Sequence, residues 1–450
     1  MSLHVSATPT REGVLASTSR PLPAIFRTAS LVLFAIGVLT FVAGLVLNHD
    51  QAGVPGTAER VWRAFHFNWL FFTSISSAAV MFVAVQRITT ARWSRPVIRF
   101  MEGYAAFLPV SVLFLALSLF AGARRIFPWT TEAPPVSEKV FWLNHAFLAP
   151  RDFLLFVILV ALQLWYIYTS VRLDVGGSPE AGAGWAANLR ARMRNGFREE
   201  RREIHSTHSL QGRLAIVMAI CFGYFWMLLS FDLSMALDMH FQSTLYGWWF
   251  FMTGWLGALM SFSLLTMWWR RYLNAYEYIE ENHFHDLGKL CFAFTAFWGY
   301  LTFDQFLIIW YGNLAEETHF FRLRLIAPWK AITFTVFMLA FVAPFFGLIS
   351  KAAKVYFPTF ILFAVCSLVG TWLCRYIEVY PSLYGVANGL PFGFWEIGIF
   401  ALYLGAWGFC YTQFMDAFPR MRVTLMTSPF RDEVQVPCNP ETMEPLPAHE

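Results

Sequence analysis

Residues 31–47 read Leu-Val-Leu-Phe-Ala-Ile-Gly-Val-Leu-Thr-Phe-Val-Ala-Gly-Leu-Val-Leu and contain no charged side chain. A helix needs about 20 mostly apolar residues to cross a bilayer core of roughly 30 Å. This stretch and the residues just before it reach that length. The sequence therefore predicts a transmembrane helix over residues 24–47, too long and too far from the first residue to be a cleavable signal.

The same pattern recurs along the whole chain of 450 residues, of which 57% are hydrophobic and only 14% are charged. Soluble domains are about 25% charged, so composition alone predicts an all-α polytopic membrane protein. The net charge of +4 is too small to indicate a nucleic-acid partner. Ten membrane helices are predicted, over residues 24–47, 66–88, 100–122, 147–170, 212–232, 245–267, 288–311, 328–349, 357–378 and 391–414.

The basic residues predict the orientation, because cytoplasmic loops of membrane proteins are rich in Lys and Arg. With both termini in the cytoplasm, about 23 of the 33 Lys and Arg residues fall inside. An odd number of helices would move the arginines of the C-terminal tail outside. The expected organisation is a cytoplasmic tail over 1–23, a ten-helix domain over 24–414, a basic cytoplasmic loop over 171–210, and a cytoplasmic tail over 415–450. In that loop, residues 188–194 are expected to form a surface helix against lipid headgroups or a partner.

Metal and haem sites are not expected. None of the six cysteines belongs to a C-x-x-C motif. The eleven histidines are predicted to lie in loops, tails or the first turns of helices, whereas haem ligands in a bundle sit at depth on facing helices. The protein is thus predicted to bind no haem, iron–sulfur cluster or metal.

A weak internal repeat suggests how the helices are grouped. Phe67-Asn-Trp-Leu-Phe-Phe opens the second predicted helix, and Tyr246-Gly-Trp-Trp-Phe-Phe opens the sixth. Both stretches face outward and lie four helices apart, although interfacial aromatic belts would also produce them. The repeat predicts two four-helix bundles, helices 2–5 and helices 6–9, with helices 1 and 10 at the periphery.

Ionisable residues within membrane helices are costly and therefore mark candidate sites. Asp304 has no basic neighbour within a turn, so it must be protonated, paired with another helix or solvated. Arg375 and Glu378 share a helix face and form either a structural ion pair or part of a proton route. The candidates predicted near the outer face are His145, Arg151, Asp152, Asp232, Asp304, Arg375, Glu378 and Glu396.

A second polar group lies at the cytoplasmic start of the seventh helix: His283, His285, Asp286 and Lys289. Asp286 favours a helix N-terminus by interaction with the helix dipole, which is its structural interpretation. The functional interpretation is a proton entry point. The residues alone favour neither.

A series of motifs occurs in order along the chain: His283-x-His-Asp-Leu-Gly-Lys-Leu, Phe297-Trp-Gly-Tyr, Asp304-Gln-Phe, Ile309-Trp-Tyr-Gly-Asn and Glu316-Glu-Thr. The connection Ser230-Phe-Asp-Leu-Ser-Met-Ala-Leu-Asp precedes them, and Trp142-Leu-Asn with Phe147 and Arg151 stands at the start of helix 4. In these motifs the chain closely resembles the F subunit of alternative complex III, a bacterial quinol:electron-acceptor oxidoreductase. The strongest match spans about 230–320, and Asp304 departs from it because a small polar residue is expected there.

The resemblance implies a polysulfide-reductase (NrfD-like) membrane fold in the bacterial inner membrane, with quinol in the outer half of a bundle. A quinone site is expected to use His145, Arg151, Asp152 and Asp232. A proton route is expected through Asp304, Arg375, Glu378 and Glu396, with entry at His283, His285, Asp286 and Lys289. The ligand would be menaquinol or ubiquinol.

The chain alone would be non-catalytic, because quinol oxidation releases two electrons for which it holds no acceptor. The implied partners are a homologous quinone-binding membrane subunit, an iron–sulfur protein, multihaem and monohaem cytochromes c, a terminal oxidase and membrane lipids. Two alternatives remain: a structural sister subunit with a degenerate quinone site, and an independent secondary transporter.

Overall fold

The computed structural model describes residues 9–47, 56–134, 137–178, 185–386 and 390–433. Within these ranges the chain is helical and contains no strand. Ten helical runs are long and apolar enough to cross a membrane, which confirms the predicted fold class. They are α2 Ala24–Val46, α3 Thr57–Ile88, the α4–η2 run Ile98–Ala121, α8 His145–Gly177, the α10–η4 run Glu200–Leu237, α11 Tyr246–Tyr272, α12 Glu281–Gly312, the α14–α15 run Lys330–Gly347, α17 Phe357–Tyr384 and α18 Phe394–Ala417.

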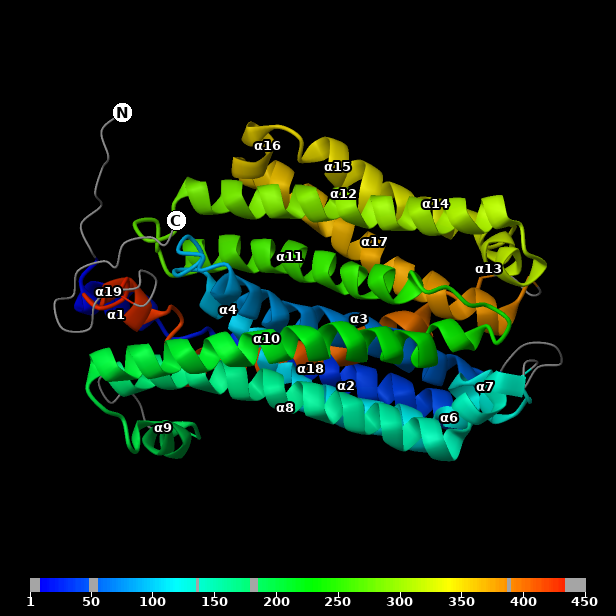
Figure 1. Ribbon diagram of the computed structural model, residues 1–450, viewed down its shortest axis with the longest axis horizontal. Helices are drawn as coiled ribbons and strands as arrows, with labels where there is room; N and C mark the ends of the chain where they lie inside the picture. Colours follow the sequence, from blue (N-terminus) through cyan, green and yellow to red (C-terminus); the bar gives the residue numbers. More distant parts are fainter. Residues whose placement is uncertain (1–8, 48–55, 135–136, 179–184, 387–389, 434–450) are drawn as a thin grey trace, which may run out of the picture.

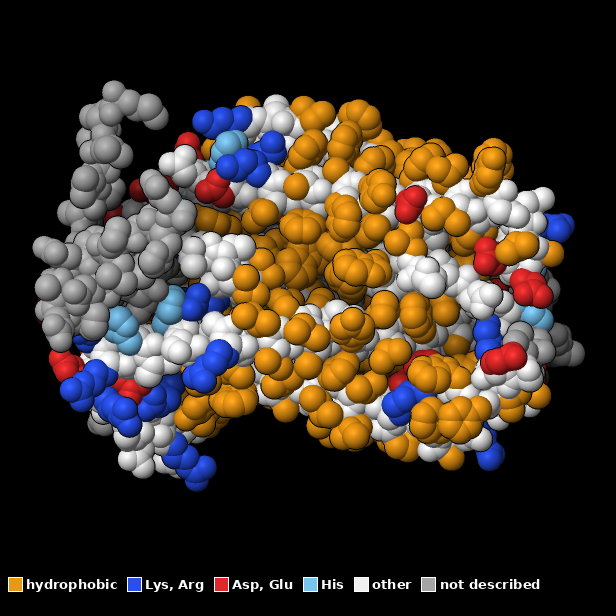
Figure 2. Space-filling view, in the orientation of Figure 1, with side chains coloured by type: hydrophobic (Ala, Val, Ile, Leu, Met, Phe, Trp, Pro, Cys, Tyr) orange, Lys and Arg blue, Asp and Glu red, His pale blue; other side chains and the backbone are white. Residues whose placement is uncertain are grey.

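The long helices run along one axis of the molecule, and short helices cover its two ends (Figure 1). We call the end with both termini the terminal face, and the opposite end the distal face. Side chains between the two ends form a wide hydrophobic band, and the charged groups gather outside it (Figure 2). The terminal face carries α1 Arg11–Thr18, α9 Ala187–Arg194, α16 Lys351–Val355 and α19 Val423–Thr427, and the distal face carries α6 Ala123–Ile126, α7 Ser137–Trp142 and α13 Ala315–Leu325.

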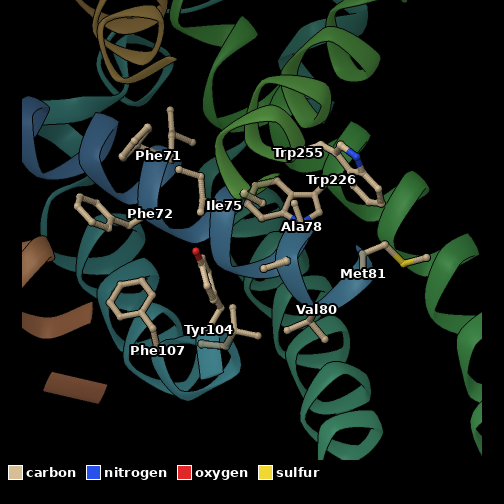
Figure 3. Close-up of a cluster of buried hydrophobic side chains, with 14 of the residues drawn as sticks. Phe71, Phe72, Ile75, Ala78, Val80, Met81, Tyr104, Phe107, Trp226 and Trp255 are labelled. Carbon is tan, nitrogen blue, oxygen red and sulfur yellow. The ribbon is translucent and has the colours of Figure 1, made fainter. Parts of the chain in front are cut away.

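The helices pack as two four-helix bundles. The first consists of α3, the α4–η2 run, α8 and α10, and the second consists of α11, α12, the α14–α15 run and α17. Helix α3 lies between the bundles because it also contacts α11, α17 and α18. Its buried aromatic side chains form much of the shared core, with Phe72 and Ile75 beside Tyr104 (Figure 3).

Helices α2 and α18 pair closely with each other at the edge of the first bundle. Small residues make this possible: Ser30, Gly37, Thr40 and Gly44 are the buried residues of α2. A Cβ atom at Gly37 or at Gly405 would overlap the backbone of the facing helix. Close backbone approach through small residues is a common way to pair helices in lipid, where apolar side chains gain little by burial.

Six membrane helices extend at least five residues beyond a predicted end: α3, α8, α10, α11, α12 and α17. Helix α3 begins at Thr57, α8 runs to Gly177, and α10 begins at Glu200. Much of the predicted loop over 171–210 is therefore helical, and α9 covers the basic run within it. Charged side chains lowered the hydropathy of these ends, but they are paired: Arg172 Nη1 lies 2.7 Å from Glu203 Oε2.

Two membrane helices contain a π-helical turn, η2 Leu117–Ala121 and η5 Met338–Val342. The turn η5 ends two residues before Pro344, which has no N–H to donate to the preceding turn of helix. A π turn is one way for a helix to absorb such an interruption.

Candidate functional site

Three residues of the first bundle form a buried carboxylate cluster near the distal face: Arg151, Asp152 and Asp232. Arg151 donates from Nη2 to Asp232 Oδ2 at 2.7 Å and from Nε to Asp152 Oδ1 at 3.1 Å. Trp142 of α7 donates from Nε1 to Asp232 Oδ1 at 2.7 Å, and its ring lies 4.0 Å from the Arg151 guanidinium carbon. Three of the residues predicted to form the quinone site therefore lie together.

The cluster has two carboxyl groups and one guanidinium group. Asp152 is fully buried, and Asp232 is 1% exposed. The trio is electroneutral when one carboxyl carries a proton and has a charge of −1 when neither does. Asp152 Oδ2 and Arg151 Nη1 are buried without a hydrogen-bond partner among the described residues. The cluster thus has the composition, and the free hydrogen-bonding positions, to take up and release one proton.

The predicted residue His145 lies nearby but outside this cluster. Its Nε2 lies 2.8 Å from the carbonyl oxygen of Leu119, within the π-helical turn η2. Its ring is 6.2 Å from that of Trp129. His145 therefore lines the same end of the bundle without contacting either carboxyl.

His66 corrects the expectation that all histidines lie in loops, tails or first helical turns. Because α3 begins at Thr57, His66 lies in its third turn and is fully buried. Its Nε2 lies 2.7 Å from the carbonyl oxygen of Leu233, next to Asp232, and its Nδ1 has no partner among the described residues. The charged residues Glu59, Arg60 and Arg63 hid this part of the helix from the hydropathy pattern.

The second bundle contains a matching buried pair, Arg375 and Glu378. Arg375 Nη1 lies 2.7 Å from Glu378 Oε1, and Nη2 donates to the Phe250 carbonyl at 2.7 Å. Both side chains are at most 1% exposed. Ser234 donates to Glu378 Oε2 at 3.2 Å and shares a hydrogen bond of 2.7 Å with the hydroxyl of Tyr246.

Residues 232–234 therefore contact both buried sites. The Asp232 side chain binds Arg151, the Leu233 carbonyl accepts from His66, and the Ser234 hydroxyl binds Glu378. Nothing in the amino-acid sequence indicated that Ser234 would contact Glu378 in the second bundle. This contact depends on how α10 ends and how α17 packs.

Arg324 of α13, which the sequence did not single out, supports the second site. Pro381 has no N–H for the Ile377 carbonyl four residues earlier in α17. Arg324 Nε donates to that carbonyl at 2.9 Å, and Nη2 donates to the Glu378 carbonyl at 2.9 Å. The guanidinium group thus completes the helix where proline interrupts it.

Two apolar cavities lie among the membrane helices, and neither is lined by Arg151, Asp152 or Asp232. One of about 380 Å³ adjoins Glu378 and is lined by aromatic residues that include Trp249, Trp298 and Phe303. The other, of about 430 Å³, lies against Phe72, Ile75 and Tyr104, which Figure 3 shows as neighbours. Flat apolar rings and hydrocarbon chains fit such surfaces.

Asp304 does not join Arg375 and Glu378. It is half-buried on α12 beside Phe303 and Ile308, which are 61% and 59% exposed, and its carboxyl group has no hydrogen bond or ion pair among the described residues. Glu396 is also separate: Arg60 binds it through two contacts of 2.6 Å, and Tyr380 donates to it at 3.2 Å.

The predicted entry group lies at the other end of the molecule, at the start of α12. His283 Nδ1 accepts from the backbone N–H of Glu280 at 3.0 Å, which caps the helix. Lys289 pairs with Asp286 at 2.6 Å, and His285 is half-buried. These four residues are near one another, but their contacts are those of a helix start and do not reach the distal sites.

Within the described ranges, no group of three or more His, Cys, Asp or Glu side chains is placed to hold a metal ion. Comparison with known proteins leaves the family open: no protein-family model matches the chain, and no curated protein does.

Proposed function

We propose that this chain is an integral membrane subunit of a respiratory quinol:electron-acceptor oxidoreductase of the alternative complex III type, contributing quinol binding and proton transfer. The single observation that supports this best is the carboxylate cluster, in which Asp152 and Asp232 share Arg151. Each quinol oxidised to quinone releases two protons and two electrons. A cluster that exchanges one proton can accept each of them in turn.

In this proposal the electrons leave through partner subunits, an iron–sulfur protein and cytochromes c. The two apolar cavities offer space for the ring or the hydrocarbon chain of a lipid-soluble quinol, menaquinol or ubiquinol. The pair Arg375–Glu378, joined to the first bundle through Ser234, belongs to the proposed proton route. Asp304, Glu396 and the group at the start of α12 stand apart from this pair.

Asparagine substitutions test the proposal, because they keep the shape of the carboxyl group and remove its proton chemistry. Asp152→Asn and Asp232→Asn are each expected to lower quinol turnover of the purified complex about tenfold or more. Asp416→Asn is the matched control, since Asp416 is half exposed at the terminal face. Copurification of the partner subunits reports assembly.

Wild-type turnover in both variants would contradict a proton-transfer role. Normal assembly with that result would favour a structural sister subunit. Purification of the chain without any redox partner would instead favour a secondary transporter.

A further inference from the structure

A small cavity at the terminal face is lined by arginine side chains from three parts of the chain. Arg87 lies in the last turn of α3, and Arg95 lies in the connection that follows. Arg422 and Arg431 belong to residues 418–433, which we call the C-terminal segment. His208 of α10 closes another side. The cavity is about 50 Å³ in volume, and a single water needs about 10–15 Å³. It therefore has room for a group the size of a small oxyanion.

The arginines that line this cavity outnumber the acidic side chains paired with them among the described residues. No Asp or Glu is among the described residues that line it. Arg422 binds Glu102 at 2.9 Å, while Arg95 and Arg431 both bind Asp432, at 2.8 and 3.4 Å. Within the described part of the chain, two carboxylates thus pair with three of the four guanidinium groups.

Arg87 is the residue whose contacts point to a missing partner. Its Nη2 donates to the backbone carbonyl of His208 at 2.8 Å, and it has no ion pair among the described residues. Its Nε is buried without a hydrogen-bond partner. A buried guanidinium N–H that is left unbonded is costly, and a planar guanidinium group suits the oxygens of phosphate particularly well.

The position of the cavity suits a headgroup at a membrane surface. Thr207 and His208 precede the apolar run predicted over 212–232, and Arg87 lies near the end of the apolar part of α3. Basic pockets between membrane helices at this level bind anionic headgroups.

We propose that this cavity is a binding site for a phosphate group, held by Arg87, Arg95, Arg422 and Arg431. The phosphate of an anionic phospholipid and free inorganic phosphate share this chemistry. Either one would link α3 and α10 to the C-terminal segment. The site is independent of quinol chemistry, since it lies at the opposite end of the molecule from the carboxylate cluster.

The test uses the full-length chain in nanodiscs of phosphatidylcholine, with and without phosphatidylglycerol, followed by native mass spectrometry. A second arm adds inorganic phosphate to the phosphatidylcholine nanodiscs and measures the shift in melting temperature. We compare Arg87→Gln with Arg271→Gln, because Arg271 is exposed in the last turn of α11 and lies outside the cavity. Arg431→Gln is a second variant in case Arg87→Gln does not fold.

We expect one phosphatidylglycerol to stay bound to the wild type and to Arg271→Gln, with at least fivefold lower occupancy in the cavity variants. Stabilisation by inorganic phosphate without lipid retention would assign the site to free phosphate. The proposal is overturned if neither probe binds the wild type, or if both bind the cavity variants and the control equally.

Discussion

Ser234 donates a hydrogen bond of 3.2 Å to Glu378, and this contact joins the end of α10 in the first bundle to α17 in the second. The same hydroxyl lies 2.7 Å from the hydroxyl of Tyr246. Two residues earlier, Asp232 binds Arg151 within the first bundle. One short segment therefore fixes the relative position of two buried charged sites.

Ser234→Ala is expected to destabilise the chain by about 1 kcal/mol, because it removes a buried cross-helix hydrogen bond and leaves Glu378 and Tyr246 each one partner short. Thermal unfolding of the purified chain measures the change. Ser230→Ala is the matched control, since the Ser230 hydroxyl donates to the Met227 carbonyl of its own helix, at 2.7 Å. Equal shifts in the two variants would argue against the bridging role.

Arg151→Leu is expected to destabilise the chain by about 3–5 kcal/mol, because it removes the guanidinium group that pairs with two buried carboxyls. In the double variant Arg151→Leu/Asp232→Asn, Asp152 is the one carboxyl of the cluster that remains. One fewer buried negative charge is therefore left without a positive partner. We expect the double variant to recover a large part of the loss in chemical denaturation. No recovery would mean that the packing of Arg151 on Trp142 outweighs its charge.

Gly405→Ala is expected to separate α2 from α18, because the new Cβ would overlap the backbone of Phe34. Forcing a methyl group into a tight contact typically costs about 1–3 kcal/mol. Gly223 of α10 is the control, since a Cβ there meets no atom within 4 Å. Melting temperatures that fall for Gly405→Ala and not for Gly223→Ala would support the close pairing. Equal melting temperatures would contradict it.

The C-terminal segment is expected to loosen in acid. Partial burial would raise the pKa of Asp432, but the hydrogen bonds from Arg95 and Arg431 and the charges of Arg95 and Arg92 prevail and hold that pKa below its usual value. The carboxylate therefore stabilises the fold at pH values above about 3.9, its ordinary pKa, and this contribution is lost as the pH falls through the lower folded value.

Hydrogen exchange of residues 423–433 measures this effect as a function of pH. Protection should fall below about pH 4 in the wild type. Arg95→Gln should lose protection at a higher pH, because it removes the nearest cation from Asp432. A pH profile that is the same in both proteins would show that Asp432 does not hold the segment.

Hydropathy and loop charges predicted the ten membrane helices, because each apolar run must satisfy its own backbone inside a membrane. The weak repeat at Phe67 and Tyr246 was enough to predict the two bundles. The same signals missed the polar ends of α3, α8 and α10, where charges such as Arg172 and Glu203 neutralise each other across helices. Pairing of this kind depends on tertiary contacts and leaves no periodic trace in the sequence.

The candidate site was predictable in part. Arg151, Asp152 and Asp232 were identified because ionisable residues are rare in membrane helices, and the structure brings them together. Their neighbour His66 was missed because the predicted helix began more than two turns too late to bury it. Asp304 stood out for the same reason as the cluster, yet it lies on a half-exposed face. For Asp304 the depth along the helix was predictable, whereas the direction around the helix axis was not.

The buried ion-pair cluster at the terminal face can form completely only near the end of protein synthesis. Glu102 and Asp174 are neutralised by Arg99 and Arg422, and Asp174 also accepts the backbone N–H of Thr424 at 2.9 Å. Because ribosomes make the chain from its N-terminus, Arg422 is the last of these four residues to appear. When the ten membrane helices have been made but Arg422 has not, Arg99 alone of the two arginines is present to neutralise Glu102 and Asp174. Arrival of the C-terminal segment is thus the event that completes the first bundle, long after its own four helices have been made.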